Sequence, residues 1–382
     1  MVIHAHHSQS PVSGEMKRII NIDTDVAGIL SDKIVEIEFY SLKAYKYVHK
    51  EGLFKLSDKV IKKYYVPNIE HLGFLNNLYC SFVIAFICKK FRPTHYIEEW
   101  KFPKGLKSLR NYFFKKTQLV LDLHGAAPEE YLYLHGTSSC VLENSEAYSV
   151  SIADKIICQS DKMKCHLVEK YGYKLDDICV FRCGVDINVF GINESARLAI
   201  RKSLNIADND IVFVYAGGMH KWQNVGKALK YYLDFNSKYA NSKMLVLTND
   251  IEGLNQIIDE ERLDGICSSL LVKSLPYSEV ASYLNAADVS FLIRDNVVMN
   301  AVASPTKLAE YMACGLPVIS TFVAQNWVSE EGMSYVFDYE NTSIYDLKNL
   351  LSSIDRERIG EYSATTLSLT IDRQTAKEFF GK

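Results

Sequence analysis

The most informative stretch of the chain reads Ser304-Pro305-Thr306-Lys307-Leu308-Ala309-Glu310-Tyr311-Met312-Ala313-Cys314-Gly315-Leu316-Pro317-Val318-Ile319. Ser304 is a favoured residue for capping the start of a helix, and Pro305 suits the first helical position, where its missing N–H costs nothing. Gly315 can stop the helix in a left-handed conformation, and Pro317 prevents the helix from resuming. The pattern therefore predicts a short helix with well-defined ends.

The flanking residues predict that this helix connects two parallel strands. Residues 288–293 form one buried apolar run and residues 318–321 the next, and the order strand, loop, helix, strand describes a crossover. The N–H groups and positive dipole end of such a helix lie outside the carboxyl edge of the sheet, where anions bind. Thr306, Lys307 and Glu310 are spaced to cluster on one side of the helix. This arrangement fits a nucleoside diphosphate with a sugar attached.

The same segment resembles a known family. Its pattern Pro-x-Lys-x-x-Glu-Tyr-x-Ala-x-Gly-x-Pro-Val-Ile is similar to the nucleotide-binding motif of retaining, family-4-type glycosyltransferases with the GT-B fold. The resemblance implies that Glu310 hydrogen-bonds the ribose of the donor nucleotide and that residues 304–306 cradle its diphosphate. The alternative is a capped, solvated helix with a Lys307–Glu310 surface pair.

The resemblance also implies the architecture of the whole chain. It implies an α/β fold with two Rossmann-like parallel-sheet domains that face each other across a cleft. Residues 1–187 would bind the acceptor and residues 188–358 the nucleotide sugar, while a C-terminal helix, residues 359–382, would pack back on the first domain. A length of 382 residues suits two domains of nearly equal size.

A second phosphate-binding segment is expected near the start of the second domain. Residues 211–218 read as a continuous apolar strand that ends in Gly217 and Gly218, and glycine lets a backbone approach a phosphate closely. The family usually places a basic pair here, but Gly218 stands where an arginine is common. Lys221 is therefore the first choice for binding the diphosphate, with Gln223 as a neutral helper. The alternative is a lysine in a solvated loop.

The main chain at Lys273 and Leu275 falls where the family meets the edge of the nucleobase. Near the N-terminus, Gly14 follows the first predicted strand and could approach the donor phosphates or the acceptor, although a plain turn explains it equally. The residues predicted to bind the nucleotide sugar are Gly14, Gly217, Gly218, Lys221, Gln223, Lys273, Leu275, Ser304, Pro305, Thr306, Lys307 and Glu310.

One candidate catalytic residue lies in the first domain. An apolar strand at residues 119–123 runs into a loop that carries His124, and the resemblance implies that a histidine here faces the donor sugar or the acceptor. The alternative is a loop histidine without a role. The predicted catalytic residues are His124, Lys221 and Glu310. His4, His6 and His7 make no metal site, because alternate residues of a strand point to opposite faces.

Composition indicates a soluble, cytoplasmic protein. The chain is 48% apolar and 23% charged, and residues 1–7 lack the features of a signal peptide. The longest apolar run, residues 78–88, is about half the length needed to span a bilayer. Nine cysteines without zinc or disulfide spacing favour a reducing compartment. Neither a metal nor a separate cofactor is expected, and the co-substrate would be a UDP- or GDP-linked sugar.

Charge is distributed unevenly along the chain. Residues 43–116 contain 16 Lys/Arg and 5 Asp/Glu, a balance of 16 − 5 = +11, whereas the whole chain carries −3. Within this region, residues 101–116 interleave cations with aromatic residues, a composition that suits an anionic membrane surface. The alternative is a solvated helix face whose aromatic residues pack inward. No recognisable nucleic-acid module accompanies it, so no nucleic-acid partner is expected.

The predicted function is transfer of a sugar, with retention, from a nucleoside-diphosphate sugar to a hydroxyl acceptor in cell-surface polysaccharide biosynthesis. The acceptor would be a glycan or a lipid-linked glycan, and the enzyme would sit in the cytoplasm, peripheral on the inner face of the membrane. One departure matters: many family members carry a first glutamate eight positions before Glu310, where this chain has Val302. A catalytically silent protein of the same fold, binding a sugar nucleotide or a partner transferase, and a sugar-nucleotide epimerase are the alternatives.

Overall fold

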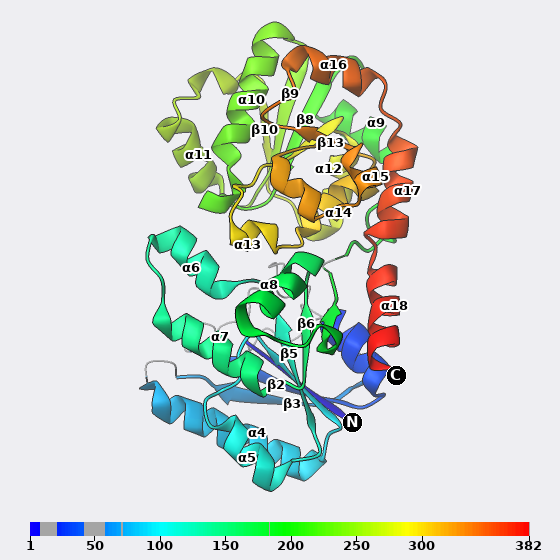
Figure 1. Ribbon diagram of the computed structural model, residues 1–382. Helices are drawn as coiled ribbons and strands as arrows, with labels where there is room; N and C mark the ends of the chain where they lie inside the picture. The colour runs from blue at the N-terminus through cyan, green and yellow to red at the C-terminus, as the bar shows by residue number, and fades with distance from the viewer. Residues whose placement is uncertain (8–20, 42–57, 70–71, 183, 382) are drawn as a thin grey trace. The chain divides into compact units, whose positions relative to one another are not determined.

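The computed structural model describes residues 1–7, 21–41, 58–69, 72–182 and 184–381. The chain forms two compact units (Figure 1). The first comprises Met1–Cys183, Val302–Ser304 and Asp372–Lys382, and the second comprises Gly184–Ala301 and Pro305–Ile371. The sequence placed its boundaries after residues 187 and 358; in the structure the chain first leaves the first unit at residue 183 and finally returns to it at residue 372.

The first unit is built on a parallel sheet of seven strands in the order β3-β2-β1-β4-β5-β6-β7. The strands are β1 (Val2–His7), β2 (Ile34–Tyr40), β3 (Val60–Pro67), β4 (His95–Glu99), β5 (Gln118–Leu123), β6 (Lys155–Cys158) and β7 (Ile178–Val180). Central strand β1 pairs with β2 and β4, so that Ala5 lies opposite Ile37 and Glu98. The central strands are apolar runs because helices cover both faces of the sheet.

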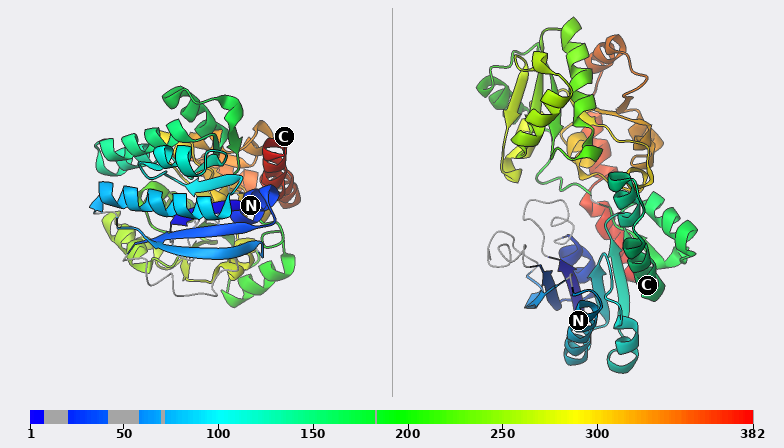
Figure 2. Two further views of the ribbon diagram at one scale, coloured as in Figure 1. Left: turned by 90° about the horizontal axis from the view of Figure 1, so that it is seen from below. Right: turned by 90° about the vertical axis from the view of Figure 1, so that its left-hand side faces the viewer.

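The helical segments of the first unit, with those at the C-terminus, are η1 (Ile22–Ala27), α2 (Gly28–Leu30), α4 (Phe74–Phe91), α5 (Leu106–Phe113), α6 (Ala127–His135), α7 (Cys140–Ile152), α8 (Asp161–Tyr171), η3 (Leu175–Asp177) and α18 (Leu369–Phe380). Ile84 of α4 and Met163 of α8 pack with Ile3 on one face of the sheet. On the other face, Val2 packs with Ala376 of α18. The arrangement of helices on both faces can be followed in Figure 2.

The C-terminal residues form two helices rather than one. Helix α17 (Arg356–Thr366) belongs to the second unit, and α18 reaches the first unit from Asp372 onward. There Arg373 Nε donates a hydrogen bond to Asp25 Oδ1 at 2.8 Å. The C-terminal helix is thus fixed to the first unit by a buried alanine against the sheet and by an ion pair with η1.

The second unit is built on a parallel sheet of six strands in the order β10-β9-β8-β11-β12-β13. The strands are β8 (Ile211–Ala216), β9 (Ser242–Leu247), β10 (Leu270–Lys273), β11 (Val289–Leu292), β12 (Val318–Ser320) and β13 (Val336–Asp338). The other helical segments of this unit are α9 (Glu194–Ser203), η4 (Lys221–Gln223), α10 (Val225–Lys238), α11 (Ile251–Glu260), η5 (Asp264–Ile266), α12 (Tyr277–Asn285), α13 (Val298–Ala301), α14 (Thr306–Ala313), η6 (Phe322–Asn326), α15 (Glu330–Met333) and α16 (Ile344–Ser352).

The strand order of the second sheet reverses between β8 and β11. Open parallel sheets bind ligands at such a switch point, in the crevice outside the carboxyl ends of the strands. Gly217 directly follows β8, and α14 lies on the connection from β11 to β12. The strands predicted at residues 211–218, 288–293 and 318–321 are confirmed as the shorter β8, β11 and β12, and they place both predicted phosphate-binding segments at this edge of the sheet.

Candidate functional site

Helix α14 ends as the sequence predicts. Gly315 has φ +73°, its N–H donates to the carbonyl of Met312 at 2.9 Å, and the N–H of Leu316 donates to the carbonyl of Tyr311 at 3.0 Å. These two bonds form a Schellman motif, in which the last carbonyls of a helix are satisfied by the chain that leaves it. Tyr311 and Leu316 are both fully buried, which closes the motif with an apolar contact.

The start of α14 differs from the prediction by one residue. Pro305, with φ −73° and ψ 112°, occupies the N-cap position, and its carbonyl accepts from the N–H of Leu308 at 3.0 Å. The prediction that Ser304 caps the helix is wrong, because the extended backbone at Pro305 leaves Ser304 outside it, in the segment that belongs to the first unit. Thr306 is the first helical residue, and no side chain caps this turn. The positive end of the helix is therefore open to an anionic group.

Lys307 links α14 to the end of strand β8. Its Nζ donates to Gln223 Oε1 at 2.9 Å and to the hydroxyl of Tyr215 at 3.2 Å. The ammonium also lies 4.8 Å from the centroid of the Tyr215 ring, within the range of a cation–π contact. Two residues predicted from separate segments, Gln223 and Lys307, are thus in direct contact, and Tyr215, which the sequence prediction missed, holds the same ammonium group.

Glycine at position 217 is favoured by its backbone conformation, and its missing side chain leaves the space that the Lys307 ammonium group occupies. Its φ of +143° is a conformation that side chains rarely adopt, and a Cβ placed on it would lie 2.1 Å from Lys307 Nζ. The glycine therefore makes room for the ammonium group. Next to it, the carbonyl of Gly218 accepts from the hydroxyl of Tyr215 at 2.6 Å. Burial, followed by the nearby Tyr311, raises the pKa of Tyr215, so its hydroxyl stays protonated and can donate.

Glu310 lies one turn further along α14. Its side chain is buried to 8% residual exposure, and its Oε1 accepts from the hydroxyl of Tyr277, the first residue of α12, at 3.1 Å. Burial, followed by the charge of Glu310, raises the pKa of Tyr277, as expected for a hydroxyl that donates to a carboxylate. The sequence prediction missed Tyr277, although it lies only two residues beyond Leu275.

The remaining predicted nucleotide residues lie close by in the fold. Lys273 is the last residue of β10, and its carbonyl accepts from the N–H of Thr248 at 2.9 Å. Leu275 follows it and packs, partly buried, against the core that contains α14. Both precede Tyr277 on the same loop, so this loop and the Glu310 carboxylate are held together by the Tyr277 hydroxyl. Gly14 lies outside the described residues.

Lys221 is exposed and starts the short helix η4. Gln223, which ends η4, is half-buried and holds Lys307. The loop itself is fixed by Arg294, whose Nη1 donates to the carbonyl of Trp222 at 2.7 Å. Arg294 follows β11 and is only 8% exposed, so it braces the loop from the switch point. Sequence reasoning did not single it out.

His124 is held between two carboxylates at the edge of the first sheet. Its Nε2 lies 2.6 Å from Asp122 Oδ2 and its Nδ1 lies 3.1 Å from Glu99 Oε1. Asp122 and Glu99 are 1% and 3% exposed, and Glu99 also accepts from the N–H of His7 at 2.9 Å. Because β4 and β5 position both carboxylates, the orientation of the ring is fixed. The sequence prediction missed the contact with Glu99.

A second cluster of charged side chains, which contains His6, lies on the same sheet. His6 Nε2 is 3.1 Å from Glu36 Oε1, and Lys63 Nζ reaches Glu36 Oε2 at 3.3 Å and Glu38 Oε2 at 2.6 Å. Burial acts to lower the pKa of His6, but the hydrogen bond and charge of Glu36 outweigh it and raise that pKa to about 9. Among the described residues, no group of three or more His, Cys, Asp or Glu is arranged to hold a metal.

The charged state of His6 predicts a pH dependence of stability. A pKa raised in the folded state stabilises the fold fully below the unfolded value, near 6.5, and this contribution is lost as the pH rises through about 9. We expect the free energy of unfolding to fall by up to about 3 kcal/mol over this range. Denaturant unfolding at pH 6.5 and pH 9.5 measures it. A His6→Gln/Glu36→Gln variant that shows the same fall would contradict this assignment.

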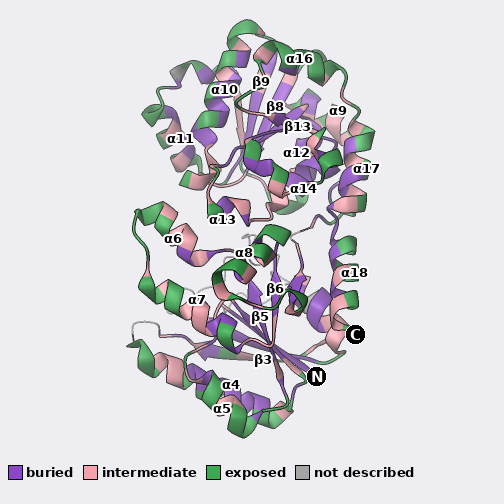
Figure 3. Cartoon of the chain, viewed as in Figure 1, coloured by how far each residue is buried: buried purple, intermediate pink, exposed green. Residues whose placement is uncertain are grey.

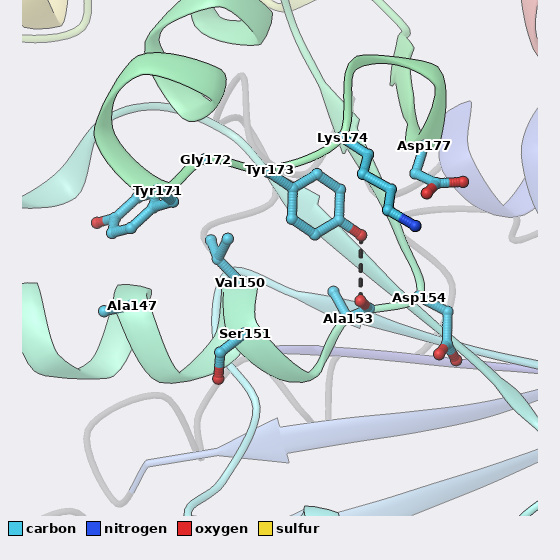
Figure 4. A pocket seen from close by; sticks show the side chains of 10 residues that line it. All are labelled: Ala147, Val150, Ser151, Ala153, Asp154, Tyr171, Gly172, Tyr173, Lys174 and Asp177. Atoms are coloured by element: carbon cyan, nitrogen blue, oxygen red, sulfur yellow. Dashed lines mark hydrogen bonds between the residues drawn. The ribbon is translucent and has the colours of Figure 1, made fainter.

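A cavity of about 470 Å³ lies elsewhere in the first unit (Figure 4). Residues of α7, of the loop before β6 and of the segment from α8 to η3 line it, and Tyr173 donates to the carbonyl of Ala153 at 3.1 Å across it. The cavity is near the amino ends of β6 and β7, whereas His124 follows the carboxyl end of β5. It is therefore separate from the edge that carries His124.

No protein-family model and no curated protein matches the chain. HepE from Anabaena, solved in complex with UDP, has a TM-score of 0.72 and 14% identity, over 100% of this chain and 99% of HepE. Sucrose-phosphate synthase from Thermosynechococcus elongatus has a TM-score of 0.70 and 14% identity, over 100% and 98%. The lipopolysaccharide outer core galactosyltransferase WaaB, in its apo form, has a TM-score of 0.65 and 14% identity, over 100% and 99%.

These similarities concern the fold, since the identities are low. They agree with the two parallel sheets of seven and six strands, each covered by helices. The fold class expected from the 304–319 motif is confirmed: this chain has the two-domain α/β fold of the GT-B glycosyltransferases.

Proposed function

We propose that this protein is a glycosyltransferase that moves a sugar from a nucleoside-diphosphate sugar to a hydroxyl acceptor. The observation that carries the proposal is the convergence of Gly217, Lys307 and Glu310 at the switch point of the second sheet. A cation, an open helix N-terminus and a buried carboxylate lie along one helix there. HepE, which shares the fold, was solved with UDP and with UDP-glucose, so UDP is the first nucleotide to test.

In this proposal the diphosphate binds between the open N-terminus of α14 and the backbone at Gly217. Negative charge develops on the diphosphate as the sugar leaves, and preorganised positive groups stabilise that charge. Lys307 supplies the principal cation, because Gln223 and Tyr215 already hold its ammonium group beside the glycine. Lys221, which is exposed, supplies a second cation from the loop. A lysine and a helix dipole can do this without a metal, so we propose that no metal or separate cofactor takes part.

The nucleoside would bind one turn further along α14, at Glu310. A carboxylate accepts hydrogen bonds at both of its oxygens, which suits the two hydroxyls of a ribose. Glu310 already receives the Tyr277 hydroxyl at Oε1, and this contact holds its side chain toward α12. The loop of Lys273 and Leu275, directly before Tyr277, is then the place for the nucleobase edge.

We propose that His124 contacts a substrate hydroxyl from the first unit. Its ring is oriented by Asp122 at Nε2 and by Glu99 at Nδ1; because an imidazole has only two ring nitrogens, the substrate hydroxyl would replace Glu99, the more distant partner at 3.1 Å. The acceptor hydroxyl would attack from the face that the leaving group vacates, which retains the anomeric configuration. The acceptor would be a glycan or a lipid-linked glycan of cell-surface polysaccharide biosynthesis, handled in the cytoplasm by an enzyme peripheral to the membrane.

Replacing His124 tests its assigned role. We expect His124→Asn to lower the transfer rate roughly 100-fold, the size of a lost acid–base or hydroxyl contact, with little change in UDP affinity. Initial-rate kinetics and UDP titration measure the two quantities separately. His135→Asn, at the exposed end of α6, is the matched control and should leave the rate unchanged. An unchanged rate in His124→Asn would remove this residue from the site.

A catalytically silent protein of the same fold is the second candidate. Val302, at the position of the family's first glutamate, is 3% exposed and packs in an apolar core, so it offers no group to a donor sugar. Binding of a sugar nucleotide without transfer would favour this candidate.

The test of the proposed function has two stages. A thermal-shift panel of UDP, GDP, ADP and CMP identifies the nucleoside, and the matching sugar nucleotides then follow. Incubation with glycan and lipid-linked acceptors, with NMR of the product, gives the transfer and its anomeric configuration; EDTA should leave the rate unchanged. Transfer with inversion, or a rate abolished by EDTA, would contradict the mechanism while leaving the donor site in place.

A further inference from the structure

Helix α4 is apolar on two sides, and only one of them is packed. Cys80, Ile84 and Cys88 of α4 are buried in the core of the first unit, against the sheet. The opposite side carries Leu75, Tyr79, Phe82 and Phe86, which are 64%, 43%, 57% and 69% exposed. Their spacing of four, three and four residues places them in one stripe along the helix. Figure 3 shows this exposed side of α4.

Helix α5 lies beside α4 and contacts it near both ends. The backbone N–H of Lys104, just before α5, donates to Asn77 Oδ1 of α4 at 3.0 Å, and Lys89 Nζ of α4 lies 5.2 Å from the centroid of the Phe113 ring. Phe113 is 42% exposed and its neighbour Tyr112 is 85% exposed. The two helices therefore pack side by side, and their exposed apolar side chains are here called the α4–α5 surface. It consists of Leu75, Tyr79, Phe82, Phe86, Tyr112 and Phe113.

Within the segment that forms α4 and α5, residues 72–116, the exposed charges have one sign. Between residues 72 and 116 the sequence contains nine Lys/Arg, and its two acidic residues, Glu98 and Glu99, are 0% and 3% exposed. The exposed charges of this segment are therefore Arg92, at the C-cap of α4, and six lysines at the C-terminus of α4 and around α5. The lysines are Lys89, Lys90, Lys104, Lys107, Lys115 and Lys116.

We propose that the α4–α5 surface docks on an anionic lipid membrane. Exposed aromatic and aliphatic side chains flanked by lysines match the boundary between lipid headgroups and acyl chains, where the rings are buried and the ammonium groups meet phosphate. This gives the membrane location proposed above a defined surface, and it does not depend on the nucleotide site.

The helix lies on the membrane rather than across it. By length and composition α4 would suffice to span a bilayer. However, Cys80, Ile84 and Cys88 form part of the core that covers the first sheet, and a spanning position would remove them from it. Only the outward stripe is available to lipid while the unit stays folded.

Cosedimentation with vesicles tests the proposal. We expect the intact chain to bind phosphatidylcholine vesicles that contain phosphatidylglycerol, to bind pure phosphatidylcholine far less, and to lose binding as salt is raised. A Phe86→Trp variant should shift its emission to shorter wavelength on the anionic vesicles, which reports insertion of the ring. No binding to the anionic vesicles, or binding without that shift, would overturn the proposal.

Two pairs of variants connect the binding to the surface. Phe82→Gln/Phe86→Gln should weaken vesicle partitioning roughly 10-fold or more, whereas Phe322→Gln/Tyr345→Gln, equally exposed in the second unit at 59% and 61%, should not. Lys107→Glu/Lys116→Glu should weaken it roughly 100-fold, and the control Lys162→Glu/Lys202→Glu much less. Equal effects within either pair would show that the α4–α5 surface is not the docking site.

A second copy of this chain is the competing occupant. Light scattering without vesicles distinguishes it. If the chain is a dimer that Phe82→Gln/Phe86→Gln converts to a monomer, the surface is a protein interface and the proposal is wrong. The melting temperature, measured on every variant, verifies that the exchanged residues left the fold intact.

Discussion

Lys307→Met is expected to reduce the transfer rate roughly 100-fold to 1,000-fold, the loss typical of one charge-stabilising donor. The ammonium group of Lys307 lies beside Gly217, held by Gln223 and Tyr215, where the diphosphate of the donor is proposed to bind. UDP affinity should fall roughly 10-fold to 100-fold, because a charge-assisted hydrogen bond contributes about 1.5–3 kcal/mol. Uridine, which has no phosphate, should bind as before. Calorimetric titration with both ligands measures the difference.

Lys221→Met is the matched control for this lysine. Lys221 is exposed and precedes Gln223 by two residues, so its charge is screened by solvent and we expect at most a several-fold loss of UDP affinity. If Lys221→Met and Lys307→Met lost the same UDP affinity, the two ammonium groups would contribute equally to UDP binding. If only Lys221→Met lost affinity, the ranking of the two lysines would be reversed.

Glu310→Ala is expected to weaken binding of UDP and of uridine alike, by roughly 10-fold to 100-fold, since hydrogen bonds to a charged acceptor contribute about 1.5–3 kcal/mol. The buried carboxylate is proposed to receive the ribose hydroxyls, which both ligands carry. This pattern differs from that of Lys307→Met, which should spare uridine. Competition against a fluorescent nucleotide gives both affinities in one experiment.

Tyr277→Phe separates the role of the carboxylate from that of its support. The variant removes only the hydroxyl that donates to Glu310 Oε1, so uridine should lose less affinity than in Glu310→Ala. Unfolding should remain cooperative in both variants, because the Glu310 side chain lies at the edge of the core. Unchanged uridine affinity in Glu310→Ala would contradict the proposal that this carboxylate binds the ribose hydroxyls.

The local signals in residues 304–319 predicted much of the second unit. Glycine at 315 and proline at 317 were sufficient to predict where α14 ends, because a left-handed stop is a local property of the backbone. The start of the helix was less certain from sequence, since Ser304 and Pro305 each suit a position near an N-terminus. In the structure Pro305 is extended and the helix begins at Thr306.

The side-chain contacts between residues of the site could not be predicted from the sequence. Lys307 meets Tyr215 across 92 residues, and Glu310 meets Tyr277 across 33. Such pairs depend on how strands β8, β10 and β11 are ordered, which no local pattern contains. Tyr215 in particular looked like one more apolar residue of a buried strand, and only the fold shows that its hydroxyl faces a lysine.

The same limit applies to α4. From sequence, its apolar run at residues 78–88 was about half the length needed to span a bilayer, whereas the helix that contains it has 18 residues. A segment with two apolar faces cannot be divided by periodicity into a packed side and an exposed side. In the structure Ile84 packs into the core against the sheet, whereas Phe82 and Phe86 stay exposed.

Calorimetric titration of the unmodified chain with UDP, UMP and uridine tests the central claim most directly. A donor site built from Glu310 and Lys307 should bind uridine weakly and UDP at least about 10-fold more tightly, because the diphosphate adds charge-assisted contacts at α14 and Gly217. If UDP bound no more tightly than uridine, and if GDP, ADP and CMP also bound no more tightly than uridine, this edge of the second sheet would not be a nucleoside-diphosphate site.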